Sequence, residues 1–375
     1  MIITGEASGE LYGARLATAL KTKYPDIHIL GVGGEKMQTA SVDIIASITG
    51  AFGLIEAVSS LLKLKTAYKT IVRYLKLCHI DALVLIDFPD FNLKVAQKAK
   101  QLGIKILYYV SPQVWAWRQG RIAKIARLTD KIAAILPFEP QLYSKYGAQC
   151  EFVGHPVMEE IDALPKDRTN LRNEFLLQNT DTAIALLPGS RHSEIDRLLP
   201  ILTDTASKIK ENIKNAKFII PLSPNIEPKR YEKQLNRLRT IGVNIINGKA
   251  NEILYACDIA VIASGTAAFQ AALIGTPMIV IYKLSPITYK IAKRLVKIKY
   301  VTLVNIIFDE QIVKELIQDN ATPDNIAKEI QKLLNDKQAL EHILSYFHKL
   351  RKIYENKEPT LKVIEMIEQI CKDER

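Results

Sequence analysis

Residues 1–10 read Met-Ile-Ile-Thr-Gly-Glu-Ala-Ser-Gly-Glu, which is a short apolar run, a turn of small residues and the start of a helix. Residues 259–268 follow the same order, because the apolar run Ile-Ala-Val-Ile precedes Ala-Ser-Gly-Thr-Ala-Ala. A strand that turns in this way into a helix leaves backbone N–H groups without helical partners at the helix N-terminus, where an anion is favoured. One such turn in each half of the chain predicts two α/β domains that face each other across a cleft for phosphorylated ligands.

The length and composition fit a globular protein of two domains. At 375 residues the chain is too long for one ordinary core and fits two domains of about 150–200 residues each. The four cysteines lie far apart without a CxxC pair, so we expect a reducing cytosol and neither disulfides nor a zinc site. The start lacks a basic and apolar leader, which argues against a signal peptide. The uncharged stretch 259–282 is divided by Gly265, Gly275 and Pro277, which favours a strand, a helix and another strand over a membrane span.

The charged residues are unevenly distributed along the chain. The net charge is +11, from 51 Lys and Arg against 40 Asp and Glu, yet residues 92–128 and 259–308 contain no acidic residue. Basic blocks of this kind suit nucleic acid, anionic lipid or phosphorylated substrates. The alternative is a solvated, lysine-rich surface.

Alternating apolar runs and helical segments predict a parallel, doubly wound sheet in each half, which makes the fold class α/β. In the first half, helices are expected over 8–22, 54–74, 93–102, 120–128 and 140–146, with strands over 27–32, 82–86, 105–110 and 131–136. In the second half, strands are expected over 183–187, 217–221, 244–246, 259–263 and 278–282, with helices beyond residue 323. We therefore expect domains over 1–160 and 161–340, followed by a helical tail over 341–375.

Common cofactor motifs are absent from the sequence. Residues 31–36 read Gly-Val-Gly-Gly-Glu-Lys, which is not the GxGxxG of dinucleotide-binding proteins, and no GxxxxGK[ST] occurs. No HExxH is present and the six histidines are scattered, so neither a metal site nor a cofactor is expected. A dehydrogenase and a P-loop NTPase are both poorly supported.

The stretch 186–191, Leu-Leu-Pro-Gly-Ser-Arg, follows an apolar run and opens a helix. Gly189 permits a tight turn, Ser190 can cap the helix or bind phosphate, and Arg191 offers a bidentate fork. Together with the turn over 264–266, this stretch predicts a site that brackets one diphosphate. The alternative is a plain strand–helix turn with a surface arginine.

The stretch 86–92, Ile-Asp-Phe-Pro-Asp-Phe-Asn, stands at the carboxyl end of an apolar strand. In open parallel sheets this edge carries ligand-binding and catalytic groups. Asp87 is therefore a candidate general base, with Asp90 or Asn92 as the cap of the next helix. The alternative is that Asp87 caps the helix itself.

Both tryptophans of the chain lie in the stretch 108–118. A packed core would explain one tryptophan, whereas two beside Pro112, followed by Arg118 and Arg121, indicate a loop over a cleft. His155 follows a similar strand end, and contact with substrate and a structural, hydrogen-bonded role are both open for it.

Five motifs in this order make the chain resemble the lipid-A-disaccharide synthases, a glycosyltransferase family of the GT-B fold. They lie at 5–9, 86–92, 110–118, 187–191 and 264–268, and the stretches 152–156 and 313–318 match as well. The resemblance covers residues 3–335 and implies two Rossmann-like domains, the first for the acceptor and the second for a UDP-sugar. The site residues that it implies are Gly5, Glu6, Ser8, Asp87, Asn92, Trp115, Arg118, His155, Gly189, Ser190, Arg191, Ser264, Gly265, Thr266, Gln270, Asn305 and Glu315.

The reaction implied by the resemblance transfers 2,3-diacylglucosamine from its UDP derivative to 2,3-diacylglucosamine 1-phosphate. A base takes the acceptor hydroxyl proton while UDP leaves from the opposite face, usually without a metal. The leaving diphosphate then needs helix N-termini and cationic side chains, which agrees with Arg191 and the turn at Gly265. Gln270 stands where many members have a Glu for the ribose hydroxyls, so it keeps an acceptor oxygen without the charge.

The expected base is a carboxylate of the first half. A sugar hydroxyl must lose its proton to a group within about 3 Å. Asp87 is the first candidate and Glu6 the second, because Asp90 is better placed as a helix cap.

Both implied substrates carry acyl chains, so we expect a peripheral protein on the cytoplasmic face of a Gram-negative inner membrane, with no nucleic acid as partner. A homodimer is compatible with this. An interfacial helix is expected from an apolar face next to two lysines, with burial in the core as the alternative: Leu54, Ile55, Val58, Leu61, Leu62, Lys63 and Lys65. A basic helix around Lys290, Lys293, Arg294 and Lys297 would bind anionic lipid.

Two other classes of function stay open at this point. A UDP-N-acetylglucosamine epimerase shares the two-domain fold and would act without an acylated acceptor. A basic nucleic-acid or membrane-binding protein would release no UDP from any sugar nucleotide, and it would leave the strand-end motifs unexplained.

Overall fold

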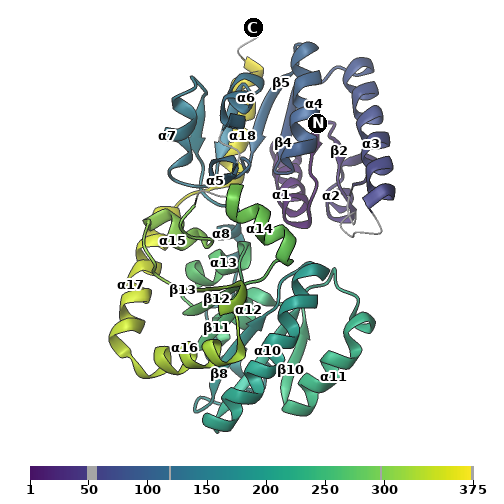
Figure 1. Cartoon of the computed structure of the whole chain (residues 1–375). Helices are drawn as coiled ribbons and strands as arrows, with labels where there is room; N and C mark the ends of the chain where they lie inside the picture. Colours follow the sequence, from purple (N-terminus) through teal and green to yellow (C-terminus); the bar gives the residue numbers. More distant parts are fainter. Residues whose placement is uncertain (49–56, 118–119, 296–297, 373–375) are drawn as a thin grey trace. The chain divides into compact units, whose positions relative to one another are not determined.

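The computed structural model describes residues 1–48, 57–117, 120–295 and 298–372. The chain divides into two compact units, which are drawn in Figure 1. Unit 1 consists of Met1–Pro156 and Asn356–Arg375, and unit 2 consists of Val157–Glu355. The end of the chain therefore returns to the unit in which the chain begins.

Among the described residues, unit 1 has a sheet of seven parallel strands in the order β3-β2-β1-β4-β5-β6-β7. Its strands are β1 (Ile2–Ile3), β2 (Leu30–Val32), β3 (Asp43–Ala46), β4 (Ala82–Ile86), β5 (Lys105–Tyr109), β6 (Lys131–Ala134) and β7 (Cys150–Phe152). Its helices are α1 (Ala7–Lys23), α2 (Glu35–Thr39), α3 (Ala57–Leu77), α4 (Pro89–Gln101), α5 (Val114–Trp117), α6 (Gly120–Leu128), α7 (Glu139–Ser144) and α18 (Pro359–Lys372).

The core of unit 1 lies between its sheet and the covering helices. Strand β4 is buried along its whole length, as expected for a parallel strand covered on both faces. Helix α4 packs against both α3 and α6, whereas α18 packs against α1 and over β5. Glu368 of α18 accepts a hydrogen bond of 2.7 Å from Tyr24 and pairs with Lys23 at the end of α1, which ties the last helix to the first.

Within the described part of the chain, unit 2 has a sheet of six parallel strands in the order β10-β9-β8-β11-β12-β13. Its strands are β8 (Thr182–Leu187), β9 (Ala216–Leu222), β10 (Val243–Asn247), β11 (Ile259–Ala263), β12 (Met278–Tyr282) and β13 (Lys314–Ile317). Its α-helices are α8 (Val157–Asp162), α9 (Arg168–Glu174), α10 (His192–Asn212), α11 (Glu232–Ile241), α12 (Ala250–Ala256), α13 (Thr266–Ile274), α14 (Pro286–Leu295), α15 (Leu303–Phe308), α16 (Pro323–Asn335) and α17 (Lys337–Tyr354).

Each sheet has one point where the strand order reverses. In unit 1 this point lies between β1 and β4, and in unit 2 it lies between β8 and β11. At such a point the loops that follow the two neighbouring strands lead to opposite faces of the sheet. A crevice is left between them at the carboxyl ends of the strands, and open α/β sheets bind ligands there. The strand order therefore indicates one pair of loops in each unit as the candidate ligand-binding loops.

The predicted parallel, doubly wound organisation is confirmed, and three strands were missing from the prediction. Strands β3, β7 and β13 lie at or near sheet edges and contain charged residues such as Asp43, Glu151 and Lys314, so they lack the apolar run that marks a central strand. Helix α4 also begins earlier than expected, at Pro89, because proline is well tolerated in the first helical turn.

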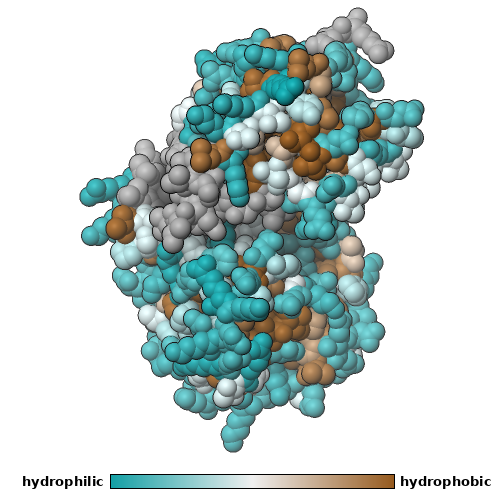
Figure 2. Space-filling view, turned by 90° about the vertical axis from the view of Figure 1, so that its right-hand side faces the viewer, coloured by the Kyte–Doolittle hydropathy of each residue, from teal (hydrophilic) through white to brown (hydrophobic). Residues whose placement is uncertain are grey.

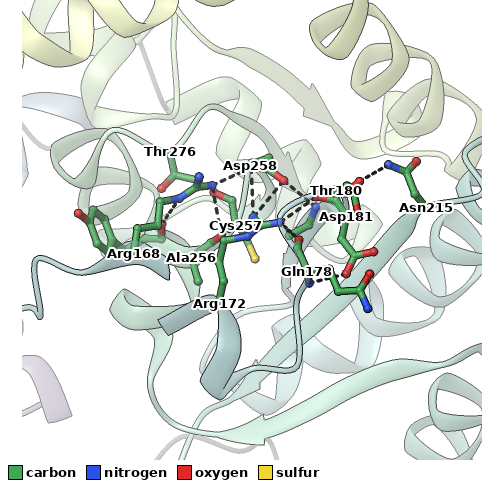
Figure 3. Close-up of polar contacts among 12 residues, drawn as sticks. Arg168, Arg172, Gln178, Thr180, Asp181, Asn215, Ala256, Cys257, Asp258 and Thr276 are labelled. Carbon is green, nitrogen blue, oxygen red and sulfur yellow. Dashed lines mark hydrogen bonds and ion pairs between the residues drawn. The ribbon is translucent and has the colours of Figure 1, made fainter. Parts of the chain in front are cut away.

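A polar network at the amino ends of β8 and β11 supports unit 2 from the opposite edge of its sheet (Figure 3). Arg172 of α9 is 4% exposed and donates to the backbone oxygens of Ala256, Gln178 and Asp181. Arg168 and Arg172 both pair with Asp258 Oδ1. Asp258 Oδ2 accepts a hydrogen bond from the backbone N–H of Ala183. Both terminal nitrogens of the buried guanidinium thus meet acceptors, and Asp258 supplies the opposite charge that a buried cation needs.

Candidate functional site

The two loops at the switch point of unit 2 are neighbours. Leu187, near the end of β8, pairs with Ile262, near the end of β11, so the loops that follow these strands emerge side by side. The first loop leads through Arg191, the N-cap residue, into α10. The second leads through Gly265, the N-cap residue, into α13. Two helix N-termini therefore lie at one edge of the sheet, as the sequence predicted for a diphosphate site.

Glu194 organises the first of these loops. Its Oε2 accepts from the backbone N–H of Ser190 at 3.0 Å and of Arg191 at 3.3 Å, and its Oε1 pairs with the Arg191 guanidinium at 3.0 Å. Gly189 has a φ of +107°, and a Cβ there would lie 2.3 Å from Glu194 Oε2. Glycine is therefore required both by the backbone conformation and by the approach of the carboxylate.

The second loop presents an open surface. A Cβ at Gly265 would have no neighbour within 4 Å, and Thr266 is exposed. Two hydrogen bonds fix Ser264: its N–H donates to Ile281 O at 3.0 Å, and its hydroxyl donates to Val301 O at 3.1 Å. Gln270 lies one turn further along α13 and is half-buried. This arrangement leaves the α13 N-terminus accessible to an anion.

Tyr282 at the end of β12 was not among the predicted site residues. Burial raises the pKa of its phenol, and the carboxylate of Glu194 adds to this effect while Arg191 and Arg197 oppose it. The neutral phenol is thus a hydrogen-bonding group beside the charges of the first loop. No sequence motif marks it, since it ends an ordinary apolar strand.

Asn305 and Glu315 form a support for the loop before α15. Asn305 is fully buried, and its amide bonds to the backbone of Ile312 and Val313 on one side and to Glu315 at 2.9 Å. Glu315 also accepts the N–H groups of residues 301 and 302 at 2.9–3.1 Å. All these contacts are within unit 2, so the pair fixes the backbone that Ser264 also binds.

The switch point of unit 1 brings together the loops that contain Gly5 and Asp87. Ile3 of β1 pairs with Leu85 of β4, so both loops leave the same edge. A Cβ at Gly5 would lie 2.2 Å from the ring of Phe88, and the missing side chain is what admits that ring. Glu6 is the half-buried N-cap residue of α1, and Ser8 is exposed in its first turn.

The backbone at Asp87 and Phe88 is strained. Both residues have positive φ, +48° and +50°, a region that non-glycine residues seldom occupy. Two hydrogen bonds of 2.7 Å, from the Tyr108 hydroxyl and the Asn92 amide, hold the Asp87 carbonyl in place. The half-buried Asp87 carboxylate is thereby presented at the strand end, whereas Asp90 is paired with Arg121 at 2.5 Å.

Trp115 and His155 are buried in unit 1. Trp115 is 8% exposed and packs edge-on against Phe138 at 5.1 Å between ring centres. Burial lowers the pKa of His155 to about 3, so its imidazole is neutral. Trp117 and Arg118, from the same predicted loop, have no described side chains.

Glu139 lies at the centre of this region and carries no signal in the sequence. It is fully buried, and its carboxylate accepts from the Ser111 hydroxyl at 2.7 Å and from the Leu136 N–H at 3.0 Å. Burial raises the pKa of Glu139 to about 7 despite these bonds. It holds the ends of β5 and β6 together from beneath the site.

Lipid-facing features also appear, although Leu54 and Ile55 lie outside the described residues and the side chains of Val58 and Leu61 are not described. Leu62 is 63% exposed in unit 1, beside the exposed Lys63 and Lys65. In unit 2, Ile287 of α14 is 74% exposed on the helix that carries Lys290, Lys293 and Arg294. Within the described ranges, none of the helices has the length and apolarity needed to cross a bilayer.

Among the side chains that the structure describes, no group of three or more His, Cys, Asp or Glu could hold a metal ion.

Comparison with known proteins supports the predicted resemblance. The model of the Lipid-A-disaccharide synthetase family matches residues 1–366. The lipid-A-disaccharide synthase of Syntrophus aciditrophicus is 40% identical over 351 residues, which cover 92% of this chain and 91% of that protein. The lipid-A-disaccharide synthase of Trichlorobacter lovleyi is 38% identical over 339 residues, which cover 90% of this chain and 88% of that protein.

Solved structures resemble the fold. The UDP-GlcNAc 2-epimerase from Neisseria meningitidis, solved with UDP-GlcNAc, aligns with a TM-score of 0.68 over 98% of this chain and 99% of its own, at 11% identity. A glycosyltransferase from Rickettsia africae aligns with a TM-score of 0.57 over 98% and 97% of the two chains, at 13% identity. At these identities the likeness is one of fold and confirms the GT-B architecture, whereas the family match and the much closer sequence relatives decide against the epimerase interpretation. The chain belongs to the lipid-A-disaccharide synthase family of glycosyltransferases.

Proposed function

We propose that the protein joins two acylated glucosamines. It transfers 2,3-diacylglucosamine from its UDP derivative to 2,3-diacylglucosamine 1-phosphate, giving the β-1′,6-linked disaccharide 1-phosphate and UDP. The observation that carries this assignment is the contrast between the two switch points. One has two helix N-termini and an arginine, and the other has a carboxylate held on a strained loop.

The diphosphate of the donor is assigned to the loops of unit 2. As the bond between the sugar C1 and the UDP oxygen breaks, negative charge develops on the leaving diphosphate. Arg191 and the N-termini of α10 and α13 stabilise that charge, because fixed cations and N–H groups gain strength where charge develops. Gln270 accepts a hydrogen bond from a ribose hydroxyl of the uridine.

The proton of the acceptor is assigned to Asp87. Its carboxylate takes the proton from the sugar 6-hydroxyl as that oxygen attacks C1 of the donor, and UDP departs from the opposite face. Glu6, on the neighbouring loop, is the second candidate. Tyr108 and Asn92 donate to the Asp87 backbone carbonyl and so fix the loop that carries the carboxylate.

The buried residues of the predicted site hold the substrate-binding loops in place and do not touch the substrates themselves. Asn92, Asn305, Trp115 and His155 are each less than 10% exposed, and the two asparagines donate hydrogen bonds to backbone carbonyls of this chain. We assign them to holding the loops that touch the substrates. Gly5, Ser8, Gly189, Ser190, Ser264, Gly265 and Thr266 form those loops.

The acylated substrates place the protein at a membrane surface, on the cytoplasmic face of the inner membrane. The exposed Leu62 and Ile287 and the cations of α14 support binding to an anionic lipid surface without insertion.

One assay tests the assignment. The purified chain is incubated with UDP-2,3-diacylglucosamine and 2,3-diacylglucosamine 1-phosphate, and the disaccharide and UDP are measured together. We expect both products in equal amounts, and no UDP when the acceptor is omitted. Conversion of UDP-N-acetylglucosamine without an acylated acceptor would instead support an epimerase.

A further inference from the structure

Unit 1 contains a cavity that the reaction described above does not use. Its volume is about 840 Å³, within the range of small-molecule sites, and it lies between α3 and α4. Its apolar lining consists of Ile48, Leu64, Tyr68, Phe88 and Phe91. The side of unit 1 on which α3 lies in Figure 1 faces the viewer in Figure 2, where brown hydrophobic surface lies among teal polar side chains.

The cavity is elongated along α4. Its lining residues on this helix run from Asp90 to Gln101 at helical spacing, so they share one face. Eleven residues of helix span roughly 16 Å. The hydrocarbon core of a bilayer is about 30 Å thick for two leaflets, so one acyl chain extends over about 15 Å. A single fatty acyl chain therefore matches the cavity in length.

The rim of the cavity is cationic. Lys65, Lys94 and Lys98 line it, whereas the one lining carboxylate, Asp90, is paired with Arg121 at 2.5 Å. An apolar floor with a positive rim suits an amphiphile with an anionic head. A neutral peptide would leave the lysines without a partner.

One end of the cavity is lined by neighbours of the assigned base, Phe88 and Asp90. Phe88 lines it and directly follows Asp87, and its ring packs on Phe91 at 5.5 Å between ring centres. A chain held here has its head group near the end of β4. The cavity thus adjoins the loop that is proposed to bind the acceptor, in unit 1, whereas the proposed donor loops belong to unit 2.

We propose that the groove between α3 and α4 binds an acyl chain of the acceptor, with Lys94, the α4 lysine of the rim that is nearer to the end of β4, facing its phosphate. This inference rests on the proposed function, because that function supplies an acylated phosphosugar as the acceptor. The groove then selects the acceptor by chain length, since its extent along α4 limits how many methylenes can be buried.

Direct binding tests the groove without catalysis. Alkyl phosphates from hexyl to tetradecyl are titrated into the full chain by calorimetry, below their micelle concentrations. Affinity should rise about fourfold for each added methylene until the groove is filled, and then stay constant. Affinity that does not depend on chain length overturns the proposal.

Two substitutions shorten the groove by different amounts. Gln97 lies seven residues beyond Asp90, about 10 Å along the helix, and Gln101 lies at the far end. Gln97→Trp should make medium and long alkyl phosphates bind equally, whereas Gln101→Trp should affect only the longest. Thr66→Trp, at an exposed α3 position outside the lining, is the matched control. A circular dichroism spectrum and a thermal unfolding curve that match those of the wild type show that each variant is folded, and unchanged chain-length profiles in both folded groove variants overturn the proposal.

The rim is tested by Lys94→Ala, with Lys98→Ala, about 6 Å further along α4, as the comparison variant. Lys94→Ala should bind decyl phosphate up to about fivefold more weakly and decanol equally well, whereas Lys98→Ala should weaken decyl phosphate less. Equal loss for both probes in Lys94→Ala would refute the role of Lys94 in holding phosphate.

The outcomes separate this inference from the proposed function. If the wild-type protein forms disaccharide but its affinity for alkyl phosphates does not depend on the alkyl chain length, the groove assignment fails and the proposed function stands. If the chain-length profile is as expected but no disaccharide forms, the function fails and the groove stands as a binding site for an anionic lipid.

Discussion

Replacing Asp87 by Asn separates proton transfer from folding and from nucleotide binding. Asn keeps the shape of the side chain and tolerates positive φ about as well as Asp, so the conformation at +48° should persist. The hydrogen bonds from Tyr108 and Asn92 go to the backbone carbonyl and are unaffected. What is removed is the basicity of the carboxylate.

We expect Asp87→Asn to slow transfer by about 10²–10⁴-fold, the range for loss of a general base, which corresponds to about 3–5 kcal/mol in the transition state. The measurement is kcat from UDP release at saturating substrates, with the Kd of UDP determined by calorimetry. UDP affinity should change little, because the diphosphate is assigned to unit 2. Glu6→Gln, on the neighbouring loop, is the comparison variant and should lower kcat much less.

Near-normal turnover of Asp87→Asn would refute the assignment. So would a loss of UDP affinity that equals the loss of rate. A much larger effect of Glu6→Gln would transfer the role of the base to Glu6.

Four further predictions follow from the geometry. Arg191→Ala should lower kcat/KM about 100-fold, or about 3 kcal/mol, and a loss below threefold would exclude it as the main cation for the diphosphate. Gly189→Ala should weaken UDP binding, because its Cβ would meet Glu194 at 2.3 Å where φ is +107°, and an unchanged Kd would contradict this. Folded Glu139 keeps its proton to about pH 7, against 4.5 in the unfolded chain, so the stability linked to that proton is complete below pH 4.5 and lost as pH rises through 7. The stability of the wild type relative to that of Glu139→Gln, measured by urea unfolding, should therefore decline from pH 4.5 to 8, because the comparison cancels the opposite contribution of His155. Binding to anionic vesicles should fall steeply from about 0.01 M to 1 M salt, since the Debye length shrinks from about 30 Å to 3 Å; equal binding at both would argue against a role for the α14 cations.

The sequence was sufficient to locate the loops because their signals are local. A glycine-rich turn after an apolar run places Gly5, Gly189 and Gly265 at strand ends, and parallel strands bring their carboxyl ends to one edge. The strand order then puts these loops at the switch points. The signals that locate these loops do not depend on contacts between residues that are distant in sequence.

The remaining features depend on contacts between distant residues. Asp258 meets Arg168 and Arg172 across roughly ninety residues, and Ser111 meets Glu139 across 28. Trp115 is buried by Phe138, a placement that its own neighbours in sequence do not reveal. The groove between α3 and α4 is likewise created by the packing of two helices and has no motif of its own.

The two switch points reach their conformations by different means, and the difference follows from what each must present. In unit 2 the groups that we propose to bind the diphosphate are backbone N–H groups, so glycine, which supplies them without a side chain, can occupy position 189, where φ is +107°. In unit 1 the loop is proposed to present a carboxylate, and glycine has none. Asp87 therefore adopts positive φ at a cost of about 1–3 kcal/mol. Hydrogen bonds from Tyr108 and Asn92, worth about 0.5–1.5 kcal/mol each, offset that cost, and the absent side chain of Gly5 gives Phe88 the space to follow. With Asp87 as the proposed base, the strain at the end of β4 is the consequence of placing a carboxylate, rather than a backbone amide, at a switch point.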